Sequence, residues 1–89
     1  MPERYIRIQN KLGLHARASA KLATEASRFT SEVTLSKGEI EVNCKSIMGI
    51  MMLAACKGTE LTLRVEGEDA DEALDALEAL VNNHFGEGG

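Results

Sequence analysis

Residues 32–42 read Glu32-Val33-Thr34-Leu35-Ser36-Lys37-Gly38-Glu39-Ile40-Glu41-Val42. Apolar and polar residues alternate on both sides of Lys37-Gly38, a pair that is typical of a tight connection. The pattern predicts two strands joined as a β-hairpin at the centre of the chain. The apolar side chains of these strands are Val33, Leu35, Ile40 and Val42.

A helix is predicted on each side of this hairpin. Residues 16–29 are rich in alanine and carry apolar residues at helical spacing, namely Leu22, Ala26 and Phe29. After the hairpin, Ser46 is a suitable N-cap for a short helix that Lys57-Gly58 ends. One face of that helix is formed by Ile47, Ile50, Met51 and Ala54.

Two further strands and a closing helix complete the pattern. Residues 5–8 alternate, with Ile6 and Ile8 on one face, and a fourth strand is defined by Leu61, Leu63 and Val65. Asp69 followed by Glu72 resembles a capping box at the start of the last helix. The inner face of that helix carries Ala70, Ala73, Leu74, Leu77 and Val81.

The element order is thus β-α-β-β-α-β-α. Each strand has one apolar face, so the simplest packing is an α+β, two-layer open-faced sandwich. Its four-stranded antiparallel sheet would carry all three helices on one face. A length of 89 residues allows a single domain, residues 1–89, in which Asn82 to Gly89 is expected to fray.

Composition limits the classes of partner. The net charge of −4 and an aromatic content of 3% argue against a nucleic-acid surface. No stretch approaches the roughly 20 apolar residues of a membrane span, and the N-terminus lacks a signal peptide's apolar core. A cytoplasmic protein is therefore expected. Cys44 and Cys56 fit no zinc motif and are expected to be free thiols, with no metal bound.

One segment has the pattern of an anion site: Gly13-Leu14-His15-Ala16-Arg17-Ala18-Ser19-Ala20. It follows the turn-forming residues Asn10-Lys11-Leu12 and places His15 at a helix start, where backbone amides lack internal partners and carry the positive end of the dipole. An anion beside His15 would meet these donors, and Arg17 could grip a phosphate in a bidentate manner. A histidine near a helix start is more often incidental than catalytic, so this segment alone leaves its role open.

A second segment makes the pattern specific: Lys45-Ser46-Ile47-Met48-Gly49-Ile50-Met51-Met52-Leu53. The first segment resembles the active-site signature of the HPr family, the phosphocarrier proteins of the bacterial phosphoenolpyruvate-dependent phosphotransferase system. The second resembles the regulatory serine site of the same family. The two occur in the family's order and separation, and the resemblance extends from Arg4 to Asn83. An HPr-like fold is therefore expected.

The resemblance implies a role for each matching residue. His15 would carry the phosphoryl group on a ring nitrogen, Arg17 would contact that group, and the backbone amides of Ala16 and Arg17 would complete the anion site. Ser46 would be a regulatory hydroxyl. Ala18 stands where the family commonly has proline, a change that removes no catalytic group and leaves the first helical turn with a good helix former.

The helix after Ser46 is apolar nearly all round, which a two-layer fold cannot fully bury. Ile50 and Met51 are expected to fill the core. Exposed methionine suits a surface that serves several partners, so partner binding is expected of Ile47, Met48 and Met52. Ser46 has a structural role as N-cap, and its regulatory phosphorylation is an equally open interpretation.

These features imply a carrier protein in a relay, without cofactor and without enzymatic activity of its own, acting as a monomer. The resemblance implies enzyme I as phosphoryl donor, IIA-type proteins or domains as acceptors, and HPr kinase/phosphorylase as the partner of Ser46. The alternative is a regulatory interaction module, either of the nitrogen-related branch of the family or controlled through Ser46. A third interpretation is an anion-binding domain without a covalent step.

Overall fold

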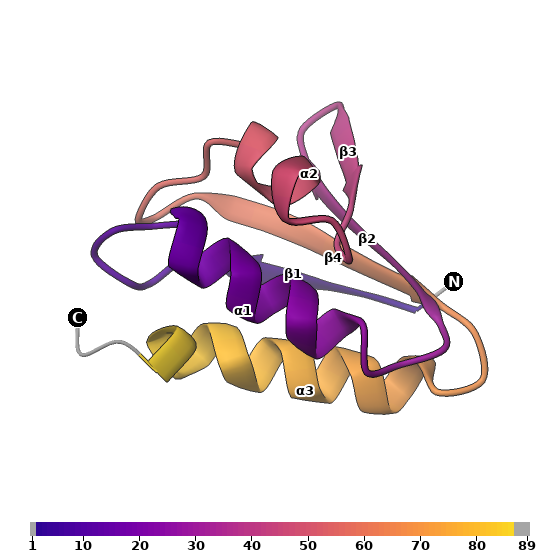
Figure 1. The fold of residues 1–89 in the computed structure, drawn as a ribbon. Helices are drawn as coiled ribbons and strands as arrows, with labels where there is room; N and C mark the ends of the chain where they lie inside the picture. Colours follow the sequence, from indigo (N-terminus) through magenta and orange to yellow (C-terminus); the bar gives the residue numbers. More distant parts are fainter. Residues whose placement is uncertain (1, 87–89) are drawn as a thin grey trace.

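The protein is a four-stranded antiparallel sheet with helices packed on one of its faces (Figure 1). The computed structural model describes residues 2–86. The strands run in the order β1-β4-β2-β3, so the predicted open-faced α+β sandwich is confirmed. The elements are β1 (Glu3–Arg7), α1 (Ala16–Ala26), β2 (Glu32–Lys37), β3 (Ile40–Asn43), α2 (Ile47–Met52), β4 (Glu60–Glu66), α3 (Ala70–Asn82) and the 3-10 turn η1 (His84–Gly86).

The predicted hairpin forms, and its register places apolar side chains together on the helix-covered face. Leu35 of β2 lies opposite Val42 of β3 on one side and Leu63 of β4 on the other. Leu61 of β4 in turn lies opposite Ile6 of β1. All five residues predicted for the inner face of α3 are buried as well, together with Ile8, Leu22 and Val33. Among residues 2–86 no helix combines the length and apolarity needed to cross a membrane.

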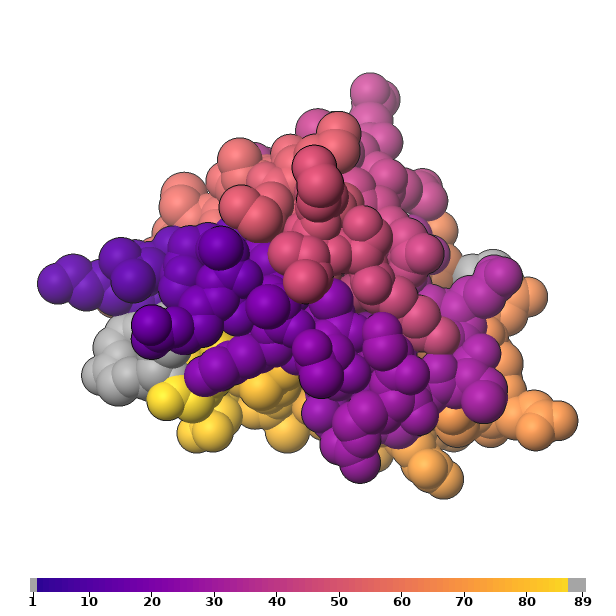
Figure 2. Space-filling view, in the orientation of Figure 1, coloured from indigo at the N-terminus to yellow at the C-terminus, as the bar shows by residue number. Residues whose placement is uncertain are grey.

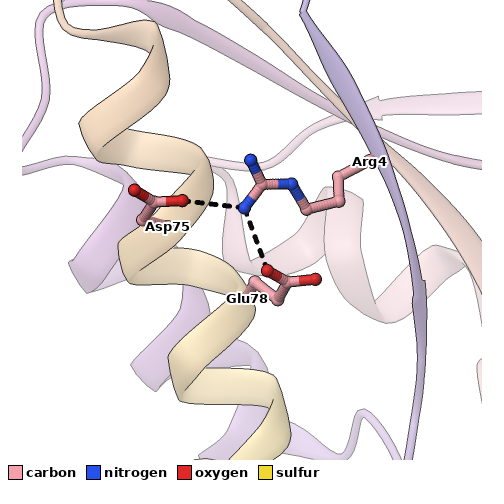
Figure 3. A network of polar contacts seen from close by, with 3 residues as sticks. All are labelled: Arg4, Asp75 and Glu78. Atoms are coloured by element: carbon pink, nitrogen blue, oxygen red, sulfur yellow. Dashed lines mark hydrogen bonds and ion pairs between the residues drawn. The ribbon is translucent and has the colours of Figure 1, made fainter.

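An arginine on β1 ties the sheet to α3 (Figure 3). The Arg4 guanidinium donates to the carboxylates of Asp75 at 2.8 Å and Glu78 at 2.9 Å. These hydrogen bonds, the one to Asp75 first, raise the pKa of Arg4 above its ordinary value. The ion pairs of Arg4 thus hold α3 against the edge strand β1 at the rim of the apolar core.

Helix α1 ends at Ala26, three residues before the predicted end. The amides of Arg28 and Phe29 bond to the carbonyls of Glu25 and Ala26, so the chain tightens into a turn of i to i+3 hydrogen bonds. Phe29 nevertheless packs against the core and is partly buried. The apolar spacing therefore indicated burial correctly but overestimated the length of the helix.

Helix α2 is shorter than predicted and buries a different face. It ends at Met52, and Ala54 lies beyond it with a φ of 50°. Met51 is 43% exposed, so its predicted place in the core is wrong. The core is filled instead by Ile50, as predicted, and by Leu53.

The predicted fraying of residues 82–89 is wrong for the part that the structure describes. Asn82 is the last residue of α3, and the following 3-10 turn buries Phe85 completely. The Phe85 carbonyl also accepts a hydrogen bond from the Lys21 ammonium at 2.7 Å. Burial of Phe85 and the Lys21 hydrogen bond together join this turn to α1. Residues 87–89 lie outside the described residues.

Asp69 precedes α3 but does not form the predicted capping box, because its side chain makes no cap hydrogen bond. Its carboxylate instead accepts from the amides of Thr30 at 2.9 Å and Ser31 at 3.0 Å, and from the Ser31 hydroxyl. These hydrogen bonds, the one from the Ser31 hydroxyl first, lower the pKa of Asp69 to about 2. The carboxylate therefore joins the turn after α1 to the start of α3 by hydrogen bonds, and we call this contact the latch.

Replacing Asp69 by asparagine is expected to lower stability at pH 7 and to weaken its acid dependence. A carboxyl group whose pKa is about 2 in the folded protein, below its ordinary value of 3.8, contributes its full stabilisation only at pH values well above 3.8. This stabilisation is lost as the pH falls towards 2. Urea unfolding at several pH values should show that the difference in free energy of unfolding between wild type and Asp69→Asn decreases as the pH falls towards 2. A difference that stays constant, or an equal effect of Asp71→Asn on the same helix, would contradict the latch.

Candidate functional site

His15 is the N-cap residue of α1. Its backbone is extended, with φ −76° and ψ −178°, and its ring Nδ1 accepts the backbone N–H of Arg17 at 3.3 Å. The lone pair of Nδ1 therefore points at the start of the helix, and the ring proton of the neutral imidazole is on Nε2. The side chain is half-buried. A nucleophilic nitrogen thus lies where the helix presents its first amides.

The first turn of α1 has the donors that an anion needs. The first hydrogen bond within the helix runs from the Ser19 amide to the His15 carbonyl, at 2.8 Å. The amides of Ala16 and Arg17 lie before it, at the positive end of the helix dipole. The Arg17 side chain is exposed on this same turn. The structure therefore places His15, Ala16 and Arg17 in an arrangement that can hold a phosphoryl group.

The chain before His15 packs closely against the loop that follows α2. Gly13 has a φ of 67°, and a Cβ atom there would lie 2.5 Å from the Ala55 carbonyl oxygen and 2.8 Å from Cys56 Cα. The Leu14 amide donates to the same Ala55 carbonyl at 2.9 Å. Only glycine fits this close approach with this backbone conformation. The contact with the residues after α2 therefore fixes the position of the backbone that leads into His15.

Ser46 starts α2, and its predicted role as N-cap is confirmed. Its Oγ accepts the Gly49 amide at 3.1 Å, and its backbone is extended. Helix α2 packs beside α1 (Figure 1), and its far end leads into the Ala55–Cys56 loop that contacts Gly13. Ser46 and His15 therefore belong to neighbouring helices.

Exposed apolar side chains lie on α2 and in the turn before His15. Met48 is 76% exposed and Met52 is 74% exposed, and Ile47 is also exposed. Two further apolar side chains are exposed here that were not predicted to be: Leu12, which is 67% exposed in the turn before His15, and Met51. The turn, α1 and α2 share one face of the molecule (Figure 2). We call these five residues the apolar surface: Leu12, Ile47, Met48, Met51 and Met52.

Leu12 could have been found from the sequence, because an apolar residue inside a turn of Asn10, Lys11 and Gly13 has no strand or helix face on which to be buried. Met51 could not, since its burial depends on where α2 ends. The two cysteines are free, as predicted. Burial raises the pKa of the Cys44 thiol to about 12, whereas Cys56 is exposed next to Gly13.

Comparisons with known proteins agree with this geometry. The family model described as "PTS HPr component phosphorylation site" matches residues 2–83. Phosphocarrier protein HPr of Neisseria meningitidis serogroup A is 56% identical over 88 residues, covering 99% of each chain. Phosphocarrier protein NPr of Shewanella violacea is 49% identical over 85 residues, covering 96% of this chain and 93% of the relative.

A solved structure gives the same result in three dimensions. The crystal structure of HPr-C-His from Thermoanaerobacter tengcongensis superimposes with a TM-score of 0.96 at 45% sequence identity, and the match covers 100% of both chains. Family model, relatives and fold agree over the segment that contains the helix-capping histidine. The chain belongs to the HPr family of phosphocarrier proteins of the phosphotransferase system.

Proposed function

We propose that this phosphocarrier accepts a phosphoryl group on Nδ1 of His15 from enzyme I and passes it to IIA-type proteins or domains of the phosphoenolpyruvate-dependent phosphotransferase system. The observation that carries the proposal is the Nδ1 lone pair of His15, which points at the first amides of α1. Nε2 is the alternative ring nitrogen, but a phosphoryl group there would lie away from these amides. The donor set therefore favours Nδ1.

The proposed step is an in-line transfer between two imidazole rings. The Nδ1 lone pair of His15 attacks phosphorus in the donor's phosphohistidine, and the N–P bond of the donor breaks as the new one forms. The electron pair of the broken bond returns to the donor nitrogen. The proton on Nε2 of His15 stays in place throughout. Positioning and charge stabilisation supply most of the catalysis in such transfers.

The start of α1 changes its hydrogen bonding in this step. Before transfer, the Arg17 amide donates to Nδ1. Once Nδ1 is bonded to phosphorus, it has no lone pair to accept, and the Arg17 amide turns to a phosphoryl oxygen together with the amide of Ala16. The Arg17 guanidinium supplies a charged donor to the same oxygens. The negative charge of the phosphoryl group is thus stabilised by hydrogen-bond donors of the two residues that directly follow His15.

The apolar surface is the proposed docking site for the donor and the acceptors. Methionine side chains adapt to several partner surfaces, which suits a carrier that binds enzyme I and IIA-type proteins in turn. The apolar surface includes Leu12, which lies in the turn directly before His15. We propose that the protein acts as a monomer in the cytoplasm, as a carrier and not as an enzyme, so that one face can serve each partner.

Replacing Met48 and Met52 together by glutamine is expected to raise the KM of enzyme I for this carrier about tenfold and to leave kcat within twofold. Docking contacts bind ground and transition states alike, so their loss appears in KM. The control is Tyr5→Gln, because Tyr5 is also exposed but lies on β1 with its neighbour Ile6 facing the core. An equal rise in KM for Tyr5→Gln, or none for the methionine variant, would contradict the docking site.

The relay is tested by supplying phosphoenolpyruvate and enzyme I, and then a purified IIA-type domain. The expected result is a label on the carrier that is lost in acid, survives base, and moves to the acceptor when the acceptor is added. A label that survives acid and is lost in base would indicate phosphoserine. A carrier that takes up no label from enzyme I would contradict the proposal.

A second candidate is a regulatory module. It is favoured by the similarity to the phosphocarrier NPr of Shewanella violacea and by the position of Ser46 as N-cap of α2, beside the exposed Met48. Phosphorylation of Ser46 by HPr kinase/phosphorylase would add negative charge next to the apolar surface and disturb docking. This function predicts that labelled carrier binds its target without passing the label on, so the acceptor step separates the two candidates.

A further inference from the structure

We propose that Asn10 and Ser19 are positioning residues for phosphoryl transfer, because they hold the two peptide groups that lead into His15. This inference rests on the proposed function of His15 as phosphoryl acceptor. Both residues are polar and fully buried, at 0% exposure, whereas most of the other buried residues among 2–86 are apolar. Neither is placed in contact with the phosphoryl group, so both act through the backbone.

The first peptide group, between Gly13 and Leu14, is held from both sides. The Asn10 side-chain amide donates to the Gly13 carbonyl at 2.8 Å. The Leu14 amide, on the opposite edge of the same peptide plane, donates to the Ala55 carbonyl at 2.9 Å. The Asn10 carbonyl also accepts the Gly13 amide at 3.2 Å, which closes the turn. Asn10 therefore fixes the turn twice, by side chain and by backbone.

The second peptide group, between Leu14 and His15, is held by Ser19. The Ser19 hydroxyl donates to the Leu14 carbonyl at 3.1 Å, and the Ser19 amide donates to the His15 carbonyl at 2.8 Å. Ser19 lies on the first turn of α1 and faces the interior. A residue of the helix itself thus sets the orientation of the peptide plane that contains the backbone nitrogen of His15.

This restraint matters because several of the residues on each side of His15 are exposed. Lys11 and Leu12 before it and Ala16 and Arg17 after it lie on the surface. A nucleophile must stay within a few tenths of an ångström of its productive place, and a misplacement of about 1 Å can cost on the order of 10²-fold in rate. The two buried hydrogen bonds supply a directional restraint on the peptide groups that the apolar packing of Leu14 and Ala18 does not.

The test compares Asn10→Ala and Ser19→Ala with a matched control, Ser31→Ala. Ser31 is also buried, and its hydroxyl bonds to Asp69 at the other end of α1. Two quantities are measured: the rate of phosphoryl transfer from phosphorylated enzyme I as a function of carrier concentration, and the NMR order parameters of the Leu14 and His15 amides. The first reports the reaction, and the second reports the restraint without any phosphoryl group.

Both positioning variants are expected to lose about tenfold in the saturating rate with KM changed less than twofold, and to show lower order parameters at Leu14 and His15. Ser31→Ala is expected to lower the Tm and to change neither quantity. Wild-type rates in folded Ser19→Ala, or an equal loss in Ser31→Ala, would overturn the inference. If the wild-type chain accepts no phosphoryl group, the proposed function fails. In that case, unchanged order parameters would refute the restraint as well, whereas lowered ones would support it.

Discussion

Replacing His15 by alanine is expected to abolish phosphoryl uptake from enzyme I, with a loss of at least about 10³-fold in the labelling rate. The variant has no nitrogen nucleophile at the start of α1, and the second histidine of the chain, His84, lies in η1 beyond α3. The fold should survive, because the lost cap hydrogen bond contributes only about 1 kcal/mol. Labelling with radioactive phosphoenolpyruvate measures the effect.

Two further variants separate the chemistry of His15 from its capping role. Asparagine is a good N-cap residue without a nucleophilic ring, so His15→Asn should retain the stability of the wild type and still take up no label. His84→Ala should be labelled at the wild-type rate. Acid-labile label on His15→Ala would show that another residue accepts the phosphoryl group.

Replacing Gly13 by alanine is expected to lower the free energy of unfolding by about 3 kcal/mol or more. The added Cβ would lie 2.5 Å from the Ala55 oxygen and 2.8 Å from Cys56 Cα, both of them backbone atoms. Overpacking of this kind costs about 1–3 kcal/mol, and the positive φ of 67° adds about 1 kcal/mol or more of strain. Because the loop must move, phosphoryl transfer should fall as well. Urea unfolding and the labelling rate measure the two effects.

Gly38 provides the matched control for this variant. Its φ of 61° is similar, but nothing lies within 4 Å of the position where a Cβ would be added. Gly38→Ala should therefore show the conformational strain alone, about 1 kcal/mol, and a normal transfer rate. Equal losses in the two variants would mean that the contact between Gly13 and the Ala55–Cys56 loop is unimportant.

The sheet and its longest helix could be predicted from the sequence because their burial follows a simple period. Alternation at Leu61, Leu63 and Val65 selects one face of β4, and all three side chains are buried. The stripe from Ala70 to Val81 does the same for α3. In both cases the apolar pattern is long enough for the period to be unambiguous.

Elements whose position depends on distant contacts could not be predicted in this way. The sequence places Asp69 three residues before Glu72, as in a capping box, but its carboxylate binds Thr30, 39 positions away. Phe85 follows the last helix as a single aromatic residue without a period, and yet it is buried. A local pattern gives no information on such long-range partners.

The candidate site divides in the same way. His15, Arg17 and Ser46 are identified by two short segments that resemble the HPr family, and the role of Ser46 as a cap follows from its place at a helix start. Asn10 and Ser19 lie in or beside the first segment, but their importance depends on hydrogen bonds to the Gly13 and Leu14 carbonyls. The contact of Ala55 with Gly13 joins residues that are far apart in the chain and required the structure.

The central claim is that Nδ1 of His15 carries the phosphoryl group, and NMR of the His15 ring tests it most directly. The ¹⁵N-labelled carrier is incubated with phosphoenolpyruvate and enzyme I, and coupling of each ring nitrogen to phosphorus is measured at alkaline pH. The expected result is one phosphoryl group per chain, bonded to Nδ1 of His15, with a shifted Arg17 amide resonance. Phosphorus bonded to Nε2, to His84 or to no histidine at all would contradict the account.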